Sequence, residues 1–210
     1  MKRFNLIVSS LMMVLISSFI SGCTPKMIKS FTDSFAKPVN NLNRRSQNIT
    51  TKKRSNSENN NNFRSAFEKA YKQAQSGDHY GAISSYTKVI ELNPSNASAY
   101  YNRGISKGEL KDYSGAIADY MKAIELDPNK HSAYTNQCLS RYYLKDFYGA
   151  ISNCNKAIEI NPQSRNAYLN RGISKEKIGD LNGACSDWSK ASDLGDQDAS
   201  RWFRNQCNKR

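Results

Sequence analysis

The stretch ASAYYNRGISKGELKDYSGAIADYMKAIELDPNK, residues 97–130, defines a pattern that returns along the chain every 34 residues. The positions that keep this step are Ala82, Ala116, Ala150 and Ala184; Pro94, Pro128 and Pro162; Tyr100, Tyr134, Tyr168 and Trp202; and Asp78, Asp112, Asp146 and Asp180. Gly104 and Gly172 are two periods apart, with Cys138 between them. A fixed period of a few tens of residues is typical of stacked-repeat architectures.

Each repeat has the pattern of two helices. The apolar stripes of 97–130 follow helical spacing, and their members are Tyr100, Gly104, Ile105, Ala116, Ile117, Tyr120, Ala123 and Ile124. Asp112 stands where the second helix needs an N-cap, and Pro128 cannot continue that helix. Because one such hairpin cannot bury both faces alone, neighbouring repeats must stack.

The period and these residue types resemble the tetratricopeptide repeat (TPR), a helix–turn–helix unit of 34 residues. The resemblance implies an all-α fold, a right-handed α-solenoid of four TPR helix hairpins plus a C-terminal capping helix. The predicted repeats are 63–96, 97–130, 131–164 and 165–198, followed by a capping helix at 199–210 with Trp202 at the fourth repeat position.

The N-terminus has the layout of an export signal. Lys2 and Arg3 precede an apolar run that ends in Ile20-Ser21-Gly22-Cys23. This segment resembles a bacterial lipoprotein signal, which implies removal of residues 1–22 and acylation of Cys23 by diacylglycerol and a further chain such as palmitate. An uncleaved transmembrane helix or an ordinary signal peptide are the alternatives. Thr24 rather than Asp after the cysteine favours the periplasmic face of the outer membrane over the inner membrane.

Residues 23–62 are predicted to be a disordered, basic, Asn-rich tether. They contain few large apolar side chains, and basic residues outnumber acidic ones by six. Treated as a flexible coil, such a segment spans roughly 35 Å. It is either a solvated spacer or a contact to anionic lipid headgroups or envelope polymer.

If Cys23 is lipidated, four cysteines remain, which is consistent with two disulfides in an oxidising compartment. Three connectivities are possible. Repeat three gains Cys138 where other repeats have Gly or Ala, and has Cys154 where they have an aromatic residue. This linked change favours Cys138–Cys154 and leaves Cys185 to pair with Cys207, with buried thiols as the alternative.

Two charged pairs recur between the helices of one repeat. Arg103 accompanies Asp119, and Arg171 accompanies Asp187, at equivalent positions. We hypothesise a hydrogen bond within each pair; the alternative is independent solvated residues.

The TPR resemblance implies a concave groove lined by the first helix of each repeat. The residues at its groove positions include Phe67, Tyr71, Tyr101, Asn102, Ile105, Thr135, Asn136, Leu139, Tyr142, Tyr143, Leu169, Asn170 and Ile173. The asparagines at 102, 136 and 170 could hydrogen-bond an extended peptide, or serve packing alone. The Lys and Asn pattern by which some TPR proteins clamp a peptide carboxylate is missing.

These features predict a membrane-anchored protein–protein interaction scaffold of the bacterial cell envelope. The expected partner is another envelope protein or peptide segment. The N-terminal lipid is expected to attach the protein to the membrane. The alternative is a basic module that binds anionic envelope polymer or lipid headgroups, since the formal net charge is +13. With two histidines, His79 and His131, and no metal-binding motif, the sequence predicts no enzyme, metal site or cofactor. Neither a small-molecule substrate nor nucleic acid is expected as a partner.

Overall fold

The computed structural model describes Lys26 and residues 44–45, 47–49 and 59–207. The chain divides into two units, Met1–Glu58 and Asn59–Arg210. In the first unit the described positions are helical and exposed. The predicted signal peptide and Cys23 lie outside the described residues. No described helix is both long and apolar enough to cross a membrane.

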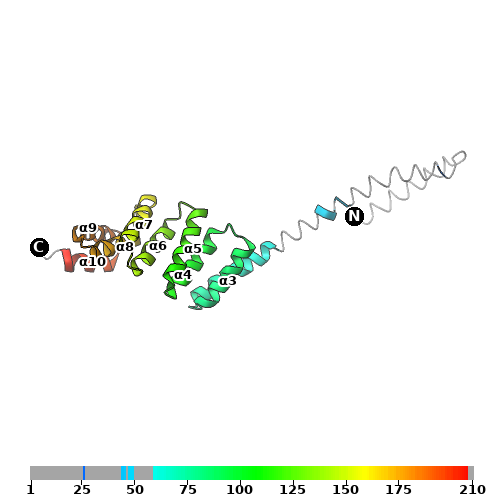
Figure 1. The fold of residues 1–210 in the computed structure, drawn as a ribbon, viewed down its shortest axis with the longest axis horizontal. Helices are drawn as coiled ribbons and strands as arrows, with labels where there is room; N and C mark the ends of the chain where they lie inside the picture. The colour runs from blue at the N-terminus through cyan, green and yellow to red at the C-terminus, as the bar shows by residue number, and fades with distance from the viewer. Residues whose placement is uncertain (1–25, 27–43, 46, 50–58, 208–210) are drawn as a thin grey trace. The chain divides into compact units, whose positions relative to one another are not determined.

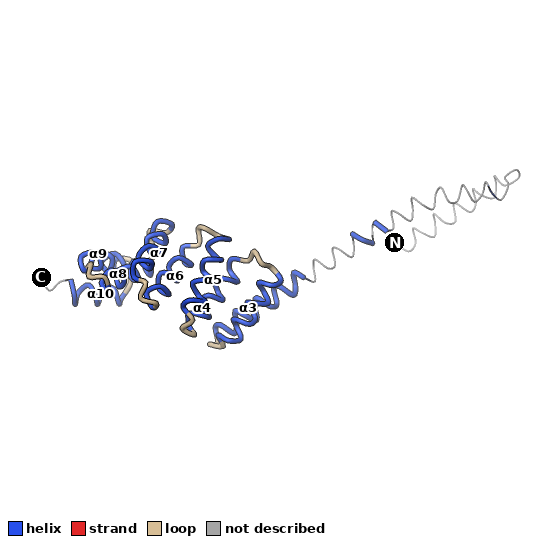
Figure 2. Tube along the Cα trace, viewed as in Figure 1, coloured by secondary structure: helices blue, strands red, loops and turns tan. Residues whose placement is uncertain are grey.

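The second unit is a row of helices joined by short turns (Figures 1 and 2). Residues 59–75 are helical. They are followed by α3 (His79–Leu92), α4 (Ala97–Glu109), α5 (Tyr113–Leu126), α6 (His131–Tyr143), α7 (Phe147–Ile160), α8 (Arg165–Lys177), α9 (Leu181–Asp193), α10 (Gln197–Trp202) and the π-helix η1 (Phe203–Cys207). The described residues contain no strand, and the architecture is the all-α solenoid that the repeat pattern predicts.

The helices pack as consecutive hairpins, α4 with α5, α6 with α7 and α8 with α9, and each hairpin packs on the next. The first helices also contact one another, α4 with α6 and α6 with α8. The second helices α5, α7 and α9 have no contacts of comparable extent among themselves. The first helices therefore form the closer, inner layer of the stack, and the second helices form the outer layer.

The in-phase aspartates cap the second helices, as predicted. Asp78, Asp112, Asp146 and Asp180 precede α3, α5, α7 and α9, and each accepts a hydrogen bond from the backbone N–H three residues later. The residue before each Asp has a positive φ, and it is Gly77, Lys111, Lys145 or Gly179. The tight turn within every hairpin thus combines a left-handed residue with an Asp N-cap.

In repeats two and four, the core of the hairpin packs a glycine on the first helix against a large ring on the second. The Tyr120 ring covers Gly104, where an added Cβ would lie 2.7 Å from the ring, and Trp188 covers Gly172, where it would lie 2.5 Å away. Columns of alanine at Ala82, Ala116, Ala150 and Ala184 are fully buried beside them. The close approach needs these small side chains because interiors pack densely.

Repeat three replaces this arrangement by a disulfide. Cys138 on α6 joins Cys154 on α7, with the Cα atoms 5.5 Å apart, and both residues are fully buried. Cys185 on α9 joins Cys207 in η1, with the Cα atoms 5.8 Å apart. This is the connectivity that the sequence analysis favours.

The C-terminal cap differs from its predicted register. The helix begins at Gln197, two residues before the predicted start, and the buried Ala199 lies three residues after its N-cap, as Ala167 does in α8. The reason is the turn Gly195-Asp196, in which Gly195 has φ 89° and Asp196 caps α10. This is the turn found within hairpins, not the longer Pro-containing connection between them, so Trp202 is not at the fourth repeat position.

The N-terminal boundary also moves. Residues 59–62, assigned to the tether from their asparagine content, are helical and continue into residues 63–75. Phe63 and Phe67 pack against the first core cluster, and the burial of these rings extends the helix despite the poor intrinsic propensity of asparagine.

Candidate functional site

The predicted groove residues lie on helix 59–75, α4, α6 and α8, the inner layer of the stack. Tyr71 and Tyr143 are 50% and 52% exposed. The half-buried members are Phe67, Tyr101, Asn102, Ile105, Asn136, Leu139, Tyr142, Leu169 and Ile173, whereas Thr135 and Asn170 are buried. The structure thus leaves aromatic and aliphatic side chains accessible along these helices.

One asparagine of the predicted column, Asn136, contacts the neighbouring repeat. Asn136 donates a hydrogen bond from Nδ2 to the Tyr101 hydroxyl at 3.2 Å. Asn170 is only 7% exposed. The hydrogen bond of Asn136 and the burial of Asn170 are consistent with a packing role for these two asparagines.

The Tyr101 side chain is held from several sides. Its ring centroid lies 6.0 Å from that of Tyr120 and 5.2 Å from Lys130 Nζ, and its hydroxyl accepts from Asn136. An aromatic ring fixed in this way loses little conformational entropy when another molecule contacts it. Tyr101 is therefore a preorganised contact residue of the inner layer.

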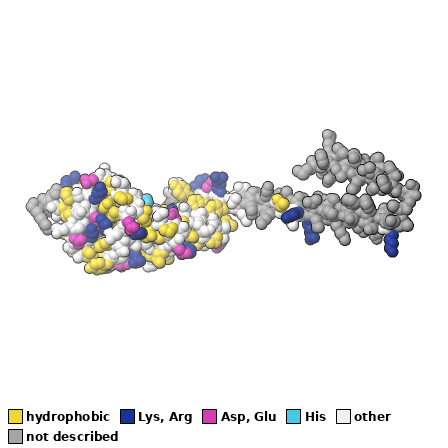
Figure 3. All heavy atoms as spheres, turned by 90° about the horizontal axis from the view of Figure 1, so that it is seen from above, with side chains coloured by type: hydrophobic (Ala, Val, Ile, Leu, Met, Phe, Trp, Pro, Cys, Tyr) yellow, Lys and Arg dark blue, Asp and Glu magenta, His cyan; other side chains and the backbone are white. Residues whose placement is uncertain are grey.

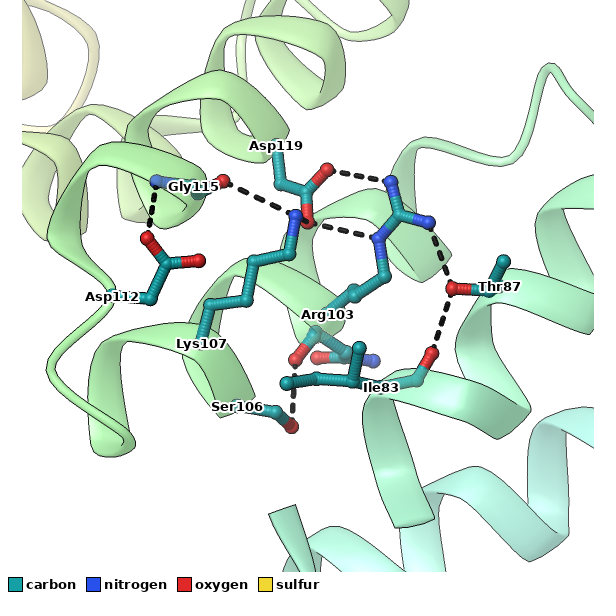
Figure 4. A network of polar contacts seen from close by, with 9 residues as sticks. Ile83, Thr87, Arg103, Ser106, Lys107, Asp112, Gly115 and Asp119 are labelled. Atoms are coloured by element: carbon teal, nitrogen blue, oxygen red, sulfur yellow. Dashed lines mark hydrogen bonds and ion pairs between the residues drawn. The ribbon is translucent and has the colours of Figure 1, made fainter. Parts of the chain in front are cut away.

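A polar network joins α3, α4 and α5 (Figure 4). Arg103 donates from Nε and Nη2 to both Asp119 oxygens, at 2.9 and 2.7 Å, and from Nη1 to Thr87 Oγ1 at 3.0 Å. Lys107 Nζ lies 2.8 Å from Asp119 Oδ2, the oxygen that also accepts from Arg103 Nε. The hypothesised Arg103–Asp119 pair is confirmed; its bidentate geometry joins the two helices of repeat two, and the hydrogen bond to Thr87 links them to the preceding repeat.

The same network recurs two repeats later. Arg171 contacts both oxygens of Asp187 at 2.9 and 2.6 Å, and donates to Asn155 of the preceding repeat at 2.7 Å. Lys175 Nζ lies 2.9 Å from Asp187. The predicted pair is confirmed; the lysine and the partner on the preceding repeat were missed. Lys107 and Lys175 are themselves 68 residues apart, a signal that could have found them.

Repeat three lacks this charged network. Gln137 and Asn153 occupy the positions of the arginine and aspartate, and the buried Asn153 Nδ2 has no hydrogen-bond partner in the described part of the chain. Arg141, which takes the lysine position, pairs instead with Asp146. This ion pair and the Gly149 N–H hold the pKa of Asp146 below its usual value, with the backbone hydrogen bond the larger cause.

Aromatic residues gather where α6 turns into α7. The rings of Tyr113 and Tyr143 stack with centroids 4.6 Å apart and 15° between their planes. Tyr142 contacts both Tyr143 and Phe147, with centroids 5.6 and 5.7 Å apart. The structure thus places Tyr142 and Tyr143 at the end of the inner layer, against the turns of repeats two and three.

The inner layer has the side chains of a protein-binding surface. Within the described ranges, no group of three or more His, Cys, Asp or Glu side chains could hold a metal ion. Asp119 and Asp187 are only 4% and 3% exposed. Each of these carboxylates forms ion pairs with one arginine and one lysine. What the inner layer offers is apolar and aromatic surface on a rigid frame, with a few amide and hydroxyl groups.

Sequence models of repeat families match part of the chain. The model described as "Tetratricopeptide repeat" matches residues 97–130, and the model described as "TPR repeat" matches residues 70–110. No curated protein matches the sequence significantly.

Solved structures resemble the second unit. A crystal structure of MamA has a TM-score of 0.62 and 25% identity, over 70% of this chain and 86% of that chain. The TPR domain of Arabidopsis OM64 has a TM-score of 0.56 and 26% identity, over 57% and 99%. The first TPR of Spaghetti (RPAP3), bound to the HSP90 peptide SRMEEVD, has a TM-score of 0.51 and 26% identity, over 53% and 90%. The stacked hairpins, the family models and these likenesses together show that the chain is a tetratricopeptide repeat protein.

Proposed function

We propose that the second unit binds a segment of a partner protein along the inner layer formed by helix 59–75, α4, α6 and α8. The observation that carries this proposal is the accessible apolar surface of that layer. Tyr71 is half exposed, and Ile105, Leu139 and Ile173 are half-buried on successive repeats. Aromatic anchors beside aliphatic side chains are typical of interface cores.

The rigidity of the frame supports the same function. Two bidentate Arg–Asp pairs and two disulfides fix the helices relative to one another. A preformed surface binds with a smaller entropic cost than one that must order first. The structural likeness to a TPR domain bound to a peptide of HSP90 is consistent with such a role.

We further propose that the protein acts in the bacterial cell envelope, held by a lipid on Cys23. The support is the sequence Ile20-Ser21-Gly22-Cys23 after an apolar run. The intervening residues would give the binding unit reach from the membrane surface. The apolar and aromatic surface of the inner layer supports an interaction role for this unit.

Site-specific photocrosslinking tests the binding surface. p-Benzoylphenylalanine replaces Tyr71 on the inner layer in one variant and Tyr80 on α3 of the outer layer in another, in the full chain in native membranes. Tyr80 is the matched control because it is 78% exposed. We expect a discrete protein crosslink from position 71 and none from position 80. Equal crosslinking from both positions contradicts the proposal.

The salt dependence of binding distinguishes docking of a protein segment from the alternative, binding to an anionic polymer. Figure 3 shows hydrophobic, basic and acidic side chains interspersed over the face of the second unit that it presents. Apolar docking should be nearly unchanged when salt is raised, whereas binding through lysines and arginines to an anionic polymer should fall steeply. A crosslink at position 71 that disappears at high salt would favour the polymer.

A further inference from the structure

The first helices of repeats two, three and four present the same two kinds of side chain on one face. Near its start each helix has a neutral polar residue whose side chain makes no hydrogen bond to another residue in the described ranges; these are Ser98, Ser132 and Asn166. Seven residues later, two helical turns along the same face, each helix has an aliphatic side chain; these are Ile105, Leu139 and Ile173. The inner layer thus offers a row of free hydroxyl and amide groups and a row of apolar side chains, about 10 Å apart.

The cations of these three helices are already engaged within the protein. Every lysine and arginine on α4, α6 and α8 forms an ion pair, and the pairs are Arg103 and Lys107 with Asp119, Arg141 with Asp146, Arg165 with Asp196, Arg171 and Lys175 with Asp187, and Lys177 with Glu176. A carboxylate of a bound segment would therefore have to displace an internal carboxylate before it could pair with a cation of these helices.

The other charges of the inner layer do not favour an acidic segment either. Glu109, the last residue of α4, is exposed and forms no ion pair with a described residue. On helix 59–75 the exposed Arg64 and Glu68 take the positions of Ser98 and Asn102, and their charges are opposite. A carboxylate placed over α4, α6 and α8 would thus lose hydration without gaining a free cation, which costs binding free energy.

We propose that the partner segment bound along α4, α6 and α8 is uncharged. Its apolar side chains lie against Ile105, Leu139 and Ile173, and its backbone forms hydrogen bonds with the neutral polar row. This inference rests on the proposed function and specifies the partner. Hydroxyl and amide groups satisfy backbone N–H and C=O groups without a charge, and the aliphatic row buries apolar surface. The internal ion pairs add selectivity, because an acidic segment finds no free cation there.

Selection of peptides on the full chain tests the proposal. The probe is a random dodecapeptide library displayed on phage, and the peptides that use the layer are those whose capture falls with Leu139→Ser. Among them we expect aspartate and glutamate at less than about half their frequency in the unselected library, with lysine and arginine not enriched. Ser98→Lys/Asn166→Lys places two unpaired cations at exposed positions of the layer. This variant should raise the frequency of acidic residues about threefold, because each exposed charge pair contributes a factor of a few.

A matched control separates the layer from the overall charge. Ser84→Lys/Ser152→Lys adds two lysines at exposed positions of α3 and α7 in the outer layer and should leave the selected composition unchanged. Both lysine variants alter exposed positions only, so their comparison holds even if Leu139→Ser unfolds.

The outcomes distinguish this inference from the proposed function. The inference is overturned if acidic residues are enriched on the parent protein, or if the two lysine variants change the selection equally. Enrichment of lysine and arginine would overturn it in favour of a basic segment. A library without any Leu139-dependent peptide also overturns it. In each case the crosslink from position 71 decides separately whether the proposed function stands.

Discussion

Repeats two and three solve the same packing problem with different chemistry. In repeat two the Tyr120 ring fills the space above Gly104, and the buried Asp119 bridges two cations. In repeat three a disulfide joins Cys138 to Cys154 at the corresponding positions, and Gln137 and Asn153 are neutral. A covalent link between the helices thus coincides with the loss of both the aromatic ring and the ion pair.

The difference shows how one helix pair can be fixed by separable means. The ring contributes apolar burial and the ion pair contributes directional hydrogen bonds, and both act in the folded state. The disulfide also restricts the unfolded chain. Substitutions that exchange the ring, the ion pair and the disulfide between the two repeats therefore measure how much each adds to the free energy of unfolding, while the backbone of the hairpin stays nearly the same.

Removing the disulfide of repeat three should have the largest effect on the free energy of unfolding. Cys138→Ala/Cys154→Ala should lower the free energy of unfolding by about 3 kcal/mol, the value expected for a loop of this size, plus a contribution from the cavity. Urea denaturation followed by circular dichroism, with the native disulfide at Cys185–Cys207 retained, gives the measurement.

A matched exchange sharpens this result. Cys138→Gly/Cys154→Tyr installs the repeat-two arrangement and should recover part of the loss, because the new ring fills the cavity beside the glycine as Tyr120 does beside Gly104. A double variant no more stable than the alanine pair would show that the two repeats are not interchangeable.

Breaking the ion pair in repeat two should cost slightly less. Asp119→Ala leaves Arg103 and Lys107 without their carboxylate in a site where their side chains are 16% and 21% exposed. We expect a loss of roughly 2 to 3 kcal/mol, below the range for a fully buried pair because water reaches both cations. Arg103→Gln/Asp119→Asn, which copies repeat three, should be less destabilising than Asp119→Ala. A thermal melt that ranks these two variants in the opposite order contradicts the explanation.

The contact between glycine and ring should tolerate no side chain. Gly104→Ala places a Cβ 2.7 Å from the Tyr120 ring, so the helices must separate, and we expect about 2 kcal/mol of destabilisation. Gly108, where an added Cβ would lie 3.8 Å from the Tyr120 hydroxyl, is the control on the same helix. Gly108→Ala should be neutral or stabilising, because alanine has the better helix propensity. Equal melting temperatures for the two variants would be evidence against close packing at Gly104.

The repeats were predictable because their signals are periodic. Asp112 and its equivalents recur in register, and the one repeat that departs from the small residue and the aromatic does so at both positions, with Cys138 and Cys154. The Arg103–Asp119 pair could be predicted because the same two residues recur 68 positions later. Periodic constraints reveal local geometry when each position faces the same neighbours in every copy.

The parts that were missed break the period or depend on tertiary contacts. The dipeptide Gly195-Asp196 repeats the hairpin turn of Gly179-Asp180, but its position suits a between-repeat connection, so the cap was predicted two residues late. The hydrogen bond of Asn136 to Tyr101 joins two repeats and could not be predicted from the period, because repeat three has Thr135 where repeat two has Tyr101. The helical start at residue 59 depends on Phe63 and Phe67 packing against a core that the local sequence does not show.

Relieving the turn strain should have the smallest effect and the opposite sign. Lys145→Gly removes a side chain from a residue with φ 63° and should raise the free energy of unfolding by about 0.5 to 1 kcal/mol, since the left-handed penalty exceeds the entropic cost of glycine. The reverse change in repeat four, Gly179→Lys, should lower it by a similar amount. Urea midpoints of the two variants against the parent protein test both signs. If Lys145→Gly destabilises, the lysine side chain contributes contacts that outweigh the left-handed penalty, and the explanation of this turn by strain is wrong.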